Sequence, residues 1–362
     1  MRIFRVLLAF IFALVTAAGI VAFIWHSKVT QFEKTLESRL TLLTGGQVTY
    51  SQLIRFMNPT EFRVLLKDVV YKLEDVQSGN VIKYTVGDVD INSDLLGNGD
   101  LSITVASQQT VEAIHNGEKR TFNVKMKGGE LALHRRGSAA NQLFSADSVS
   151  VVDALSGEIV AEVDNAYLSY ADGVAEGALW EVSASHLDVK ASRLQDPIKN
   201  LSFVWSFDHT QKTSLPHLVS AILLENTESI DQILADYIRY AAINESFIHV
   251  KGMSYKLGDF WLTFNGDIGV ARDYSFYPYG AMSFTTNNLE LVLDRLRSKN
   301  YIQNMPLKQH RMLTRMMLQK QPSYNVNVGV NRGALLLNGA PSGDAPFMGN
   351  ILGVSHLLEL KE

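Results

Sequence analysis

The stretch Leu201–Asp208 reads LSFVWSFD and carries the pattern that decides this fold. Leu201, Phe203, Trp205 and Phe207 occupy alternate positions, and serine or aspartate fills most of the positions between them. Successive side chains of a β-strand point to opposite faces of a sheet. The spacing therefore predicts a half-buried strand with one apolar face and one solvated face.

The same alternation recurs earlier in the chain, at residues 101–105 (LSITV) and 122–127 (FNVKMK). Turn signals such as Asn116-Gly117 and Gly128-Gly129 separate the alternating runs. Pairs of this kind are typical of tight connections between antiparallel strands. From about residue 47 to residue 212 the sequence therefore predicts a long series of antiparallel strands.

Apolar residues at helical spacing interrupt this series in the second half of the chain. We expect helices over residues 215–224, 229–242, 288–298 and 306–320. Pro216 is well placed in the first turn of the first helix, and Ser229 with Gln232 forms a plausible capping box at the start of the second. The last expected elements are the two strands of a hairpin, residues 324–330 and 334–338.

Residues 6–25 read VLLAFIFALVTAAGIVAFIW, a run without a charge, an amide or a proline. Twenty helical residues cover about 30 Å, which is the thickness of a bilayer's hydrocarbon core. The run continues well past Ala17 and Ala18, the pair that most resembles a cleavage site, so we favour an uncleaved anchor over a cleaved signal peptide. With Arg2 and Arg5 before the run, we expect the N-terminus inside and the rest of the chain outside.

These patterns predict a mainly β chain with helical insertions, of the α+β class. An N-terminal transmembrane helix is followed by an elongated, curved antiparallel sheet. The expected divisions are a membrane anchor (1–26), a helical linker (27–46), an extended antiparallel β region (47–212), and a helix-plus-hairpin region that completes the same sheet (213–362).

Composition argues against several classes of function. The net charge is −4, and 19% of the residues are charged, without the basic stripe that nucleic-acid binding requires. The chain has no cysteine, so it forms neither disulfides nor thiolate metal sites. Its histidines lack metal-ligand spacing, and it contains no nucleophile elbow, Walker loop or dinucleotide fingerprint. We therefore expect no cofactor, no metal and no enzymatic activity.

Two polar patterns resemble functional sites, and a simpler structural explanation is favoured for each. The adjacent pair Asp208-His209 is expected to cap the strand before it rather than to act in catalysis. The run 88–94 (DVDINSD) resembles the opening of a calcium loop, but Ser93 and Gly99 stand where an EF-hand needs glycine and glutamate. Alternation instead predicts a strand whose acidic residues face solvent.

Basic residues gather on the predicted helix 306–320: Lys308, His310, Arg311, Arg315 and Lys320. Its other side carries Leu313, Met316 and Met317. A basic amphipathic helix can lie on an anionic lipid surface, which would make Lys308, Arg311 and Arg315 lipid contacts. The same pattern describes a helix that covers a sheet, and this second interpretation is favoured.

The segment GALLLNGAPSG (333–343) resembles the last hairpin of an uncharacterised family of bacterial envelope proteins, classed as a domain of unknown function. The form of that hairpin is Gly-x-Leu-x-Leu-Asn-Gly-x-Pro-x-Gly, and the residues that fit it are Gly333, Leu335, Leu337, Asn338, Gly339, Pro341 and Gly343. The segment 45–73 looks like the family's first strand pair. It departs from it over residues 56–59, where a glycine would precede the aromatic–proline turn. A second membrane-anchored family, from gamma-proteobacteria, ends in a similar hairpin.

More distantly, the chain resembles AsmA-type envelope proteins, whose long curved sheets are described as holding lipid acyl chains in an apolar groove. This resemblance implies an inner-membrane protein of a Gram-negative bacterium with its sheet in the periplasm. It transfers no catalytic residue to any position of this sequence.

Two functional hypotheses follow. In the first, the protein serves envelope biogenesis or maintenance and holds acyl chains in a groove lined by Leu101, Ile103, Val105, Phe122, Val124, Met126, Leu201, Phe203, Trp205 and Phe207. In the second, it is a non-enzymatic scaffold or assembly factor whose sheet edges pair with an envelope protein. The helical insertions could fill the groove, and this would favour the scaffold. The expected partners are a membrane crossed once and either lipid or envelope proteins, without nucleic acid.

Overall fold

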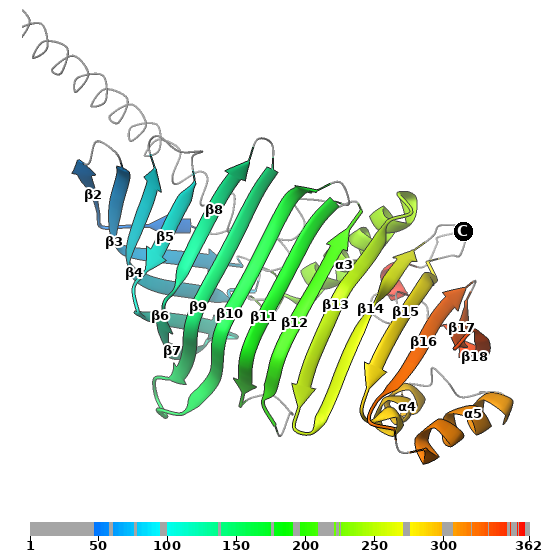
Figure 1. The fold of residues 1–362 in the computed structure, drawn as a ribbon. Helices are drawn as coiled ribbons and strands as arrows, with labels where there is room; N and C mark the ends of the chain where they lie inside the picture. Colours follow the sequence, from blue (N-terminus) through cyan, green and yellow to red (C-terminus); the bar gives the residue numbers. More distant parts are fainter. Residues whose placement is uncertain are drawn as a thin grey trace, which may run out of the picture.

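The structure, a computed structural model, describes most of the chain from residue 47 onward (Figure 1). The described residues are 47–57, 61–75, 78–94, 100–136, 139–174, 177–190, 196–208, 221, 224, 226–270, 276–298, 307–319, 321–331, 333–345, 348, 353 and 355–358. The predicted anchor (1–26) and linker (27–46) lie outside them. Within the described part of the chain, no helix combines the length and the hydropathy that crossing a bilayer requires.

The described strands form one large antiparallel sheet of 18 strands, which confirms the prediction of a mainly β chain. The strands are β1 (Gln47–Thr49), β2 (Gln52–Met57), β3 (Glu61–Glu74), β4 (Val81–Asp94), β5 (Leu101–Val105), β6 (Gln108–His115), β7 (Glu118–Lys127), β8 (Glu130–Arg136), β9 (Ala139–Asp153), β10 (Ile159–Val174), β11 (Gly177–Val189), β12 (Ile198–Phe207), β13 (Phe247–Leu257), β14 (Phe260–Val270), β15 (Pro278–Thr286), β16 (Tyr324–Asn331), β17 (Ala334–Leu337) and β18 (Ala340–Asp344). The helices are α3 (Thr227–Ile243), α4 (Leu289–Ser298), α5 (Leu307–Leu318) and α7 (Ser355–Leu358).

The sheet is largely a meander, and from β8 to β18 each strand pairs with the next one along the chain. β5 and β6 pair with the two halves of β4, so together they act as one bent strand. β8 and β7 pair with the two halves of β9 in the same way. At the first edge, β1 and β2 lie along different parts of β3. The sheet continues past residue 212 without a break, because β12 pairs with β13.

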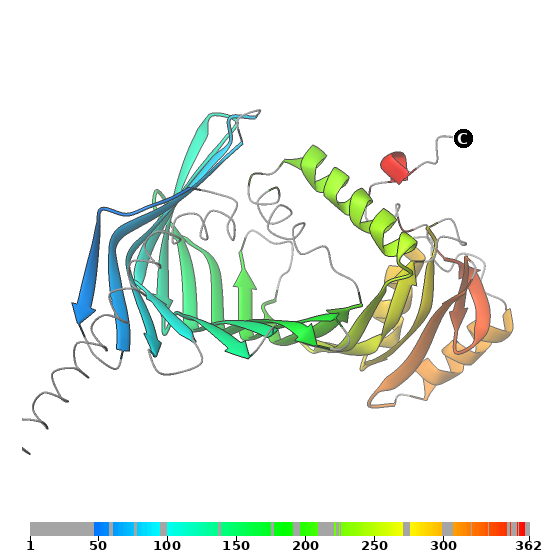
Figure 2. The same cartoon turned by 90° about the horizontal axis from the view of Figure 1, so that it is seen from above.

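The sheet is curved, and α3 crosses its concave side (Figure 2). At the start of this helix, the Asn226 side-chain amide donates a hydrogen bond of 2.9 Å to the carboxylate of Asp75, which follows β3. The Asn80 amide, just before β4, donates one of 2.9 Å to the Leu224 carbonyl. At the other end, buried residues of α3 pack against Val270 at the end of β14. The helix therefore connects two distant parts of the curved sheet.

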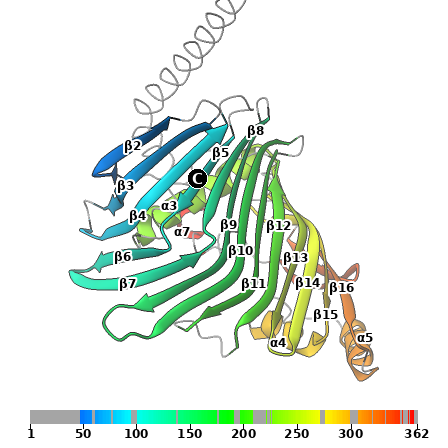
Figure 3. The same cartoon turned by 60° about the vertical axis from the view of Figure 1, so that its left-hand side comes forward.

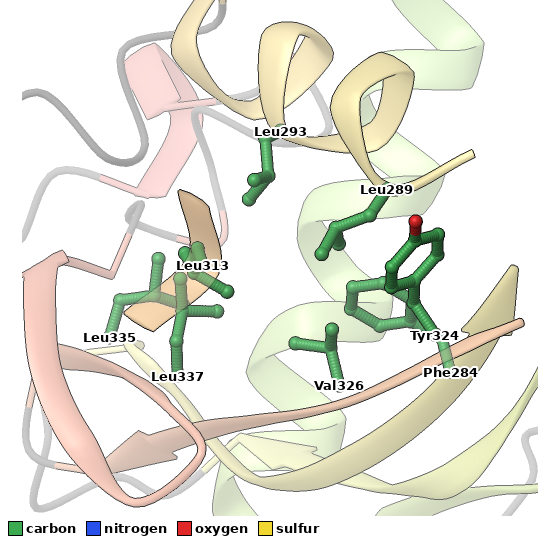
Figure 4. Close-up of a cluster of buried hydrophobic side chains, with 8 residues drawn as sticks. All are labelled: Phe284, Leu289, Leu293, Leu313, Tyr324, Val326, Leu335 and Leu337. Atoms are coloured by element: carbon green, nitrogen blue, oxygen red, sulfur yellow. The ribbon is translucent and has the colours of Figure 1, made fainter. Parts of the chain in front are cut away.

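α4 and α5 cover the last strands of the sheet (Figure 4). The buried cluster between helices and strands consists of Phe284, Leu289, Leu293, Leu313, Tyr324, Val326, Leu335 and Leu337. Four of these side chains, namely those of Leu289, Leu293, Val326 and Leu337, are no more than 1% exposed. This end of the apolar face is thus closed by the protein itself.

A row of residues with positive φ crosses neighbouring strands in the first two thirds of the sheet, where β9 and β10 bend along their length (Figure 3). Its members include Asp68 (52°), Gly87 (79°), Gly128 (66°), Asn165 (49°) and Asn200 (52°). An L-residue in this region interrupts the regular pleat, as in a β-bulge. We call this line of residues the bulge row.

The bulge row changes the phase of alternation in each strand that it crosses. Leu66 and Val69 are three residues apart, yet both belong to one buried cluster. The same phase shift occurs in β10, where the apolar residues Val163 and Ala166 are three positions apart with Asn165 between them. Neighbouring strands shift phase at the same line. The sheet therefore bends there, while the same face stays apolar on both sides of the bulge row.

The helix and hairpin predictions are largely confirmed. α3, α4 and α5 match the helices expected over 229–242, 288–298 and 306–320. The capping box at Ser229 is wrong, because the N-cap of α3 is Asn226, whose side chain accepts a 3.0 Å hydrogen bond from the Ser229 N–H. β16 and β17 form the expected hairpin, and β18 follows them as a further strand. Most of the expected helix 215–224 lies outside the described residues.

Candidate functional site

One continuous row of directly opposed apolar residues crosses the sheet from β3 to β16. Its members are Val64, Ile91, Ile103, Leu131, Phe144, Leu168, Val182, Phe203, Met253, Phe264, Phe284 and Val326. Residues directly opposite each other in an antiparallel pair point to the same face. We call this set the long apolar row. Neighbouring strands lie about 4.8 Å apart, so the row extends over roughly 50 Å.

The row of positions beside it, on the opposite face, is polar from β4 to β16. Its members are Asp90, Thr104, Glu130, Ser145, Tyr167, Ser183, Ser202, Ser254, Thr263, Thr285 and Asn325. A shallow hollow on this face is lined by Ser202, Thr263 and Asn325 among others. The sheet is therefore amphipathic across its whole width.

The apolar face is the concave one. Phe207 shares its face with Phe203 and Trp205, because the three residues alternate within β12. The Phe207 ring meets the ring of Tyr237 in α3 edge to face, with centroids 5.9 Å apart. Since α3 lies on the concave side (Figure 2), the long apolar row lies there too.

The long apolar row is buried at its two ends and accessible in the middle. At one end Val64 is 0% exposed and Ile91 is 3% exposed, and at the other end Val326 is 0% exposed. The members between β5 and β14 are half-buried, apart from Leu168 of β10, which is 40% exposed. The two ends are thus ordinary core, whereas the middle is an apolar surface that the described chain covers only in part.

Aromatic rings occupy the accessible middle of this face. The rings of Tyr170 and Trp180 have centroids 4.5 Å apart, and Trp180 stacks on Trp205 at 6.1 Å. Phe203 lies 4.3 Å from Trp205 and 6.5 Å from Phe264. These rings form a strip across β10 to β14, which we call the aromatic strip.

Beyond the bulge row, the same face carries a second set of opposed apolar residues. This short apolar row consists of Met126, Val149, Val163, Leu187, Ile198, Leu257 and Phe260. A Cβ placed on Gly129 would meet both Met126 of this row and Val105, which lies two residues from Ile103 on the same face, so the two rows come close at that point. Together the two rows make up what we call the concave apolar face.

The structure places the residues predicted to line a groove on this face. Ile103 and Phe203 belong to the long apolar row, and Met126 belongs to the short one. The others lie two or four residues along a strand from a row member, so they point to the same face. They are Leu101, Val105, Phe122, Val124, Leu201, Trp205 and Phe207. All are half-buried except Val124, which is 7% exposed.

The sequence prediction missed most other members of the long apolar row, among them Leu131, Phe144, Leu168, Val182 and Met253. Alternation within their own strands was the available signal for these residues. It shows that each lies on an apolar face, but it does not show which residue of the next strand stands opposite. The pairing register supplies that information.

A carboxylate–imidazole–carboxylate group lies at the end of β12. His249 Nε2 is 2.6 Å from Asp208 Oδ1, and His249 Nδ1 is 2.7 Å from Asp267 Oδ1. Partial burial lowers the pKa of His249, but the hydrogen bonds and charges of Asp267 and Asp208 outweigh this and raise the pKa above its ordinary value of 6.5. Both ring nitrogens of His249 therefore have a carboxylate partner.

Asp208 also pairs with the first residue of β13, since its carboxylate accepts a 3.2 Å hydrogen bond from the Phe247 N–H. Ser206, opposite His249, has a buried hydroxyl that lacks a hydrogen-bond partner in the described part of the structure. The arrangement holds three neighbouring strands together. His209, its neighbour in sequence, lies outside the described residues.

The acidic run 88–94 is part of β4, as alternation predicts, but Asp88 and Asp90 are half-buried and ion-paired rather than fully facing solvent. Arg63 makes a two-pronged ion pair with Asp90, and Lys67 pairs with Asp88. Val89 and Ile91 between them are buried. Among the described residues, no group of His, Asp and Glu side chains is arranged to hold a metal ion.

The basic helix α5 covers the sheet, as the favoured interpretation predicts. Leu313 is 2% exposed within the cluster of Figure 4, and Met316 and Met317 pack against that cluster. Arg311 and Arg315 are exposed on the other side. Lys308 lies within the helix, but its side chain is outside the described set.

No protein-family model, no curated protein and no solved structure matches this chain. The resemblance of residues 333–343 to an envelope family therefore stays a prediction.

Proposed function

We propose that this chain is a membrane-anchored protein of bacterial envelope biogenesis or maintenance that holds lipid acyl chains against its concave apolar face. The observation that carries the proposal is the long apolar row, which is buried at both ends and accessible in the middle. Its accessible part extends across several strands and contains the aromatic strip. Soluble monomers rarely expose a contiguous apolar patch larger than a few hundred Å² unless the patch binds something.

The chemistry of the face favours a hydrocarbon occupant over a peptide. The long apolar row contains no hydrogen-bonding side chain, and the backbone groups beneath it pair with the neighbouring strands. A peptide laid across this face would leave its own N–H and C=O groups without partners. An acyl chain has no such groups, and burying it contributes about 25 cal/mol for each Å² of apolar surface removed from water.

The proposal places the protein in the bacterial inner membrane, with the N-terminus in the cytoplasm and the sheet in the periplasm. The apolar run 6–25 supports a single span, and Arg2 and Arg5 before it support this orientation. The resemblance of the last hairpin to envelope proteins agrees with this location. The proposed role is non-enzymatic, because the long apolar row contains no acidic, basic or nucleophilic side chain.

Photo-crosslinking in cells tests the proposal on the full chain. A benzophenone amino acid at Phe203 lies in the middle of the long apolar row and should form adducts with lipid. The matched control is the same amino acid at Ser202, which is the adjacent residue of β12 on the polar face. We expect lipid adducts, identified by mass spectrometry, from the Phe203 position only. Absence of lipid adducts at that position, or equal yields at both positions, contradicts the proposal.

A second candidate function rests on the open edges of the sheet. Among the described strands, β2 pairs only with β3, and β18 pairs only with β17. An unpaired edge can add a strand from another protein. If the protein is a scaffold, a crosslinker at the exposed edge residue Gln52 gives a single protein adduct, and the Phe203 position gives no lipid.

A further inference from the structure

The segment Arg295–Gly343 differs in charge from the rest of the chain. It contains no aspartate or glutamate, although the whole chain has a net charge of −4. Its eight basic residues are Arg295, Arg297, Lys299, Lys308, Arg311, Arg315, Lys320 and Arg332. Positive charge that is concentrated in one segment of an acidic chain favours an anionic partner for that segment.

The helix α5, at the centre of this segment, presents basic residues on the side that faces away from the sheet. Leu313 identifies the side of α5 that faces the sheet, because it is 2% exposed and belongs to the buried cluster. Arg311 and Arg315 are four residues apart, so they lie one above the other on the helix, and both are exposed. Among the described residues neither forms an ion pair. Both guanidinium groups thus lie on the exposed side of α5.

An exposed apolar side chain continues this outer stripe. Leu318 follows Arg315 by three residues and is 76% exposed. Arg311, Arg315 and Leu318 thus stand at i, i+4 and i+7, the spacing of one helix face. Basic and large apolar side chains on one face fit the boundary between lipid headgroups and acyl chains. A nucleic-acid backbone offers the charge but no counterpart for the leucine.

α5 also lies far from the strands that follow the predicted anchor. Figure 1 shows β2 and β3 at one end of the sheet and α5 at the other. The intervening strands carry the long apolar row, which extends over roughly 50 Å. A bilayer contact through α5 would therefore be a second attachment, distinct from the anchor.

We infer that the outer face of α5, formed by Arg311, Arg315 and Leu318, binds the surface of an anionic phospholipid bilayer. The arginines attract lipid phosphates, and the leucine enters the boundary with the acyl chains. This inference is independent of the proposed acyl-chain site, because it concerns the opposite side of the helix that closes that face.

The test uses the full chain held by its N-terminal segment in nanodiscs of neutral phosphatidylcholine. Binding to added vesicles is measured by flotation, with vesicles of phosphatidylcholine alone or mixed with phosphatidylglycerol. We expect tighter binding to the anionic vesicles and weaker binding at high salt. The double variant Arg311→Gln/Arg315→Gln should bind them about 25-fold more weakly, because each basic residue near an anionic surface contributes about a factor of five.

The matched control is Lys199→Gln/Lys256→Gln, which removes the same charge from two exposed, directly paired residues of the sheet. It should bind as the unchanged protein does. A second pair of variants tests the leucine: Leu318→Ser should weaken binding, while Leu155→Ser, at a position 98% exposed in the turn between β9 and β10, should not.

Three results would overturn the inference. The first is equal binding of the unchanged protein to neutral and anionic vesicles. The second is equal loss of binding in the arginine variant and the lysine control. The third is a photo-crosslinker at Arg315 that yields protein adducts in cells instead of lipid. The Phe203 crosslinking experiment tests the acyl-chain site independently of vesicle binding, so either proposal can be contradicted while the other stands.

Discussion

Single residues of the bulge row have a backbone conformation that most side chains avoid. Asn165 has a φ of 49°, and its side-chain amide donates a 2.8 Å hydrogen bond to the Ser185 hydroxyl on the next strand. Asparagine tolerates the left-handed region, whereas a β-branched residue does not. This position therefore depends on residue type more than an ordinary exposed strand position does.

We predict that Asn165→Val lowers the free energy of unfolding by about 1–3 kcal/mol, because valine is strained at positive φ. Asn165→Gly is the matched control, since it also loses the hydrogen bond but accepts the backbone angle. The midpoint of urea unfolding, measured on both purified variants, checks this. If glycine costs as much as valine, the hydrogen bond rather than the backbone angle decides the position.

His249 predicts a dependence of stability on pH. Its pKa in the folded chain lies above the ordinary value of 6.5, because Asp267 and Asp208 favour the charged ring. The contribution is therefore fully present below that ordinary value and is lost as the pH rises through the raised value. Relative to His249→Gln, the unchanged protein should be more stabilised at about pH 5.5 than at about pH 8.5, as urea midpoints measure. A constant difference across this range would contradict the assignment.

At the scale of elements, the helices followed from their apolar spacing because each covers one side of the sheet. The predicted N-cap of α3 is three residues late, because Ser229 and Gln232 offer a capping pattern of their own. The protein instead uses Asn226, whose oxygen caps the helix while its amide nitrogen reaches Asp75. A contact with a segment so distant in sequence leaves no local signal.

We predict that Leu313→Ala in α5 costs about 2–5 kcal/mol, because it leaves a cavity in the cluster of Figure 4. Leu318→Ala on the same helix is the control, since that side chain is 76% exposed, and it should change the free energy by less than about 0.5 kcal/mol. Thermal unfolding monitored by circular dichroism measures both. Equal effects would mean that α5 does not pack on the sheet as described.

At the scale of the whole molecule, an antiparallel sheet could be predicted because tight turns separate runs of alternating residues. The continuity of the long apolar row could not be predicted, since it depends on the register of every strand pair at once. The bulge row has a faint signal in sequence: two consecutive polar or glycine positions break the alternation, as at Lys67-Asp68 and Asp164-Asn165. Only the aligned strands show that these breaks form one line.

Dependence on neighbouring strands also limits what the sequence predicts about the candidate site. Alternation was enough to place Ile103, Phe203 and Trp205 on an apolar face. It could not show that Val64 and Val326 close the row at its ends, because their burial depends on β2 and on α4 with α5. Whether an apolar face is core or binding surface is decided by what covers it, and a single strand does not contain that information.

The pairing of each strand from β8 to β18 with its neighbour in the chain has a consequence for how the protein folds. Hairpins such as β13–β14 and β16–β17 join residues that are close in sequence, whereas β12–β13 and β15–β16 are joined by segments that contain helices. Little loop entropy opposes each new hairpin, and a growing sheet offers the next strand a ready template. The sheet can therefore form progressively from its first strands as the chain emerges, and α4 and α5, which close its far end, become available only late in that process.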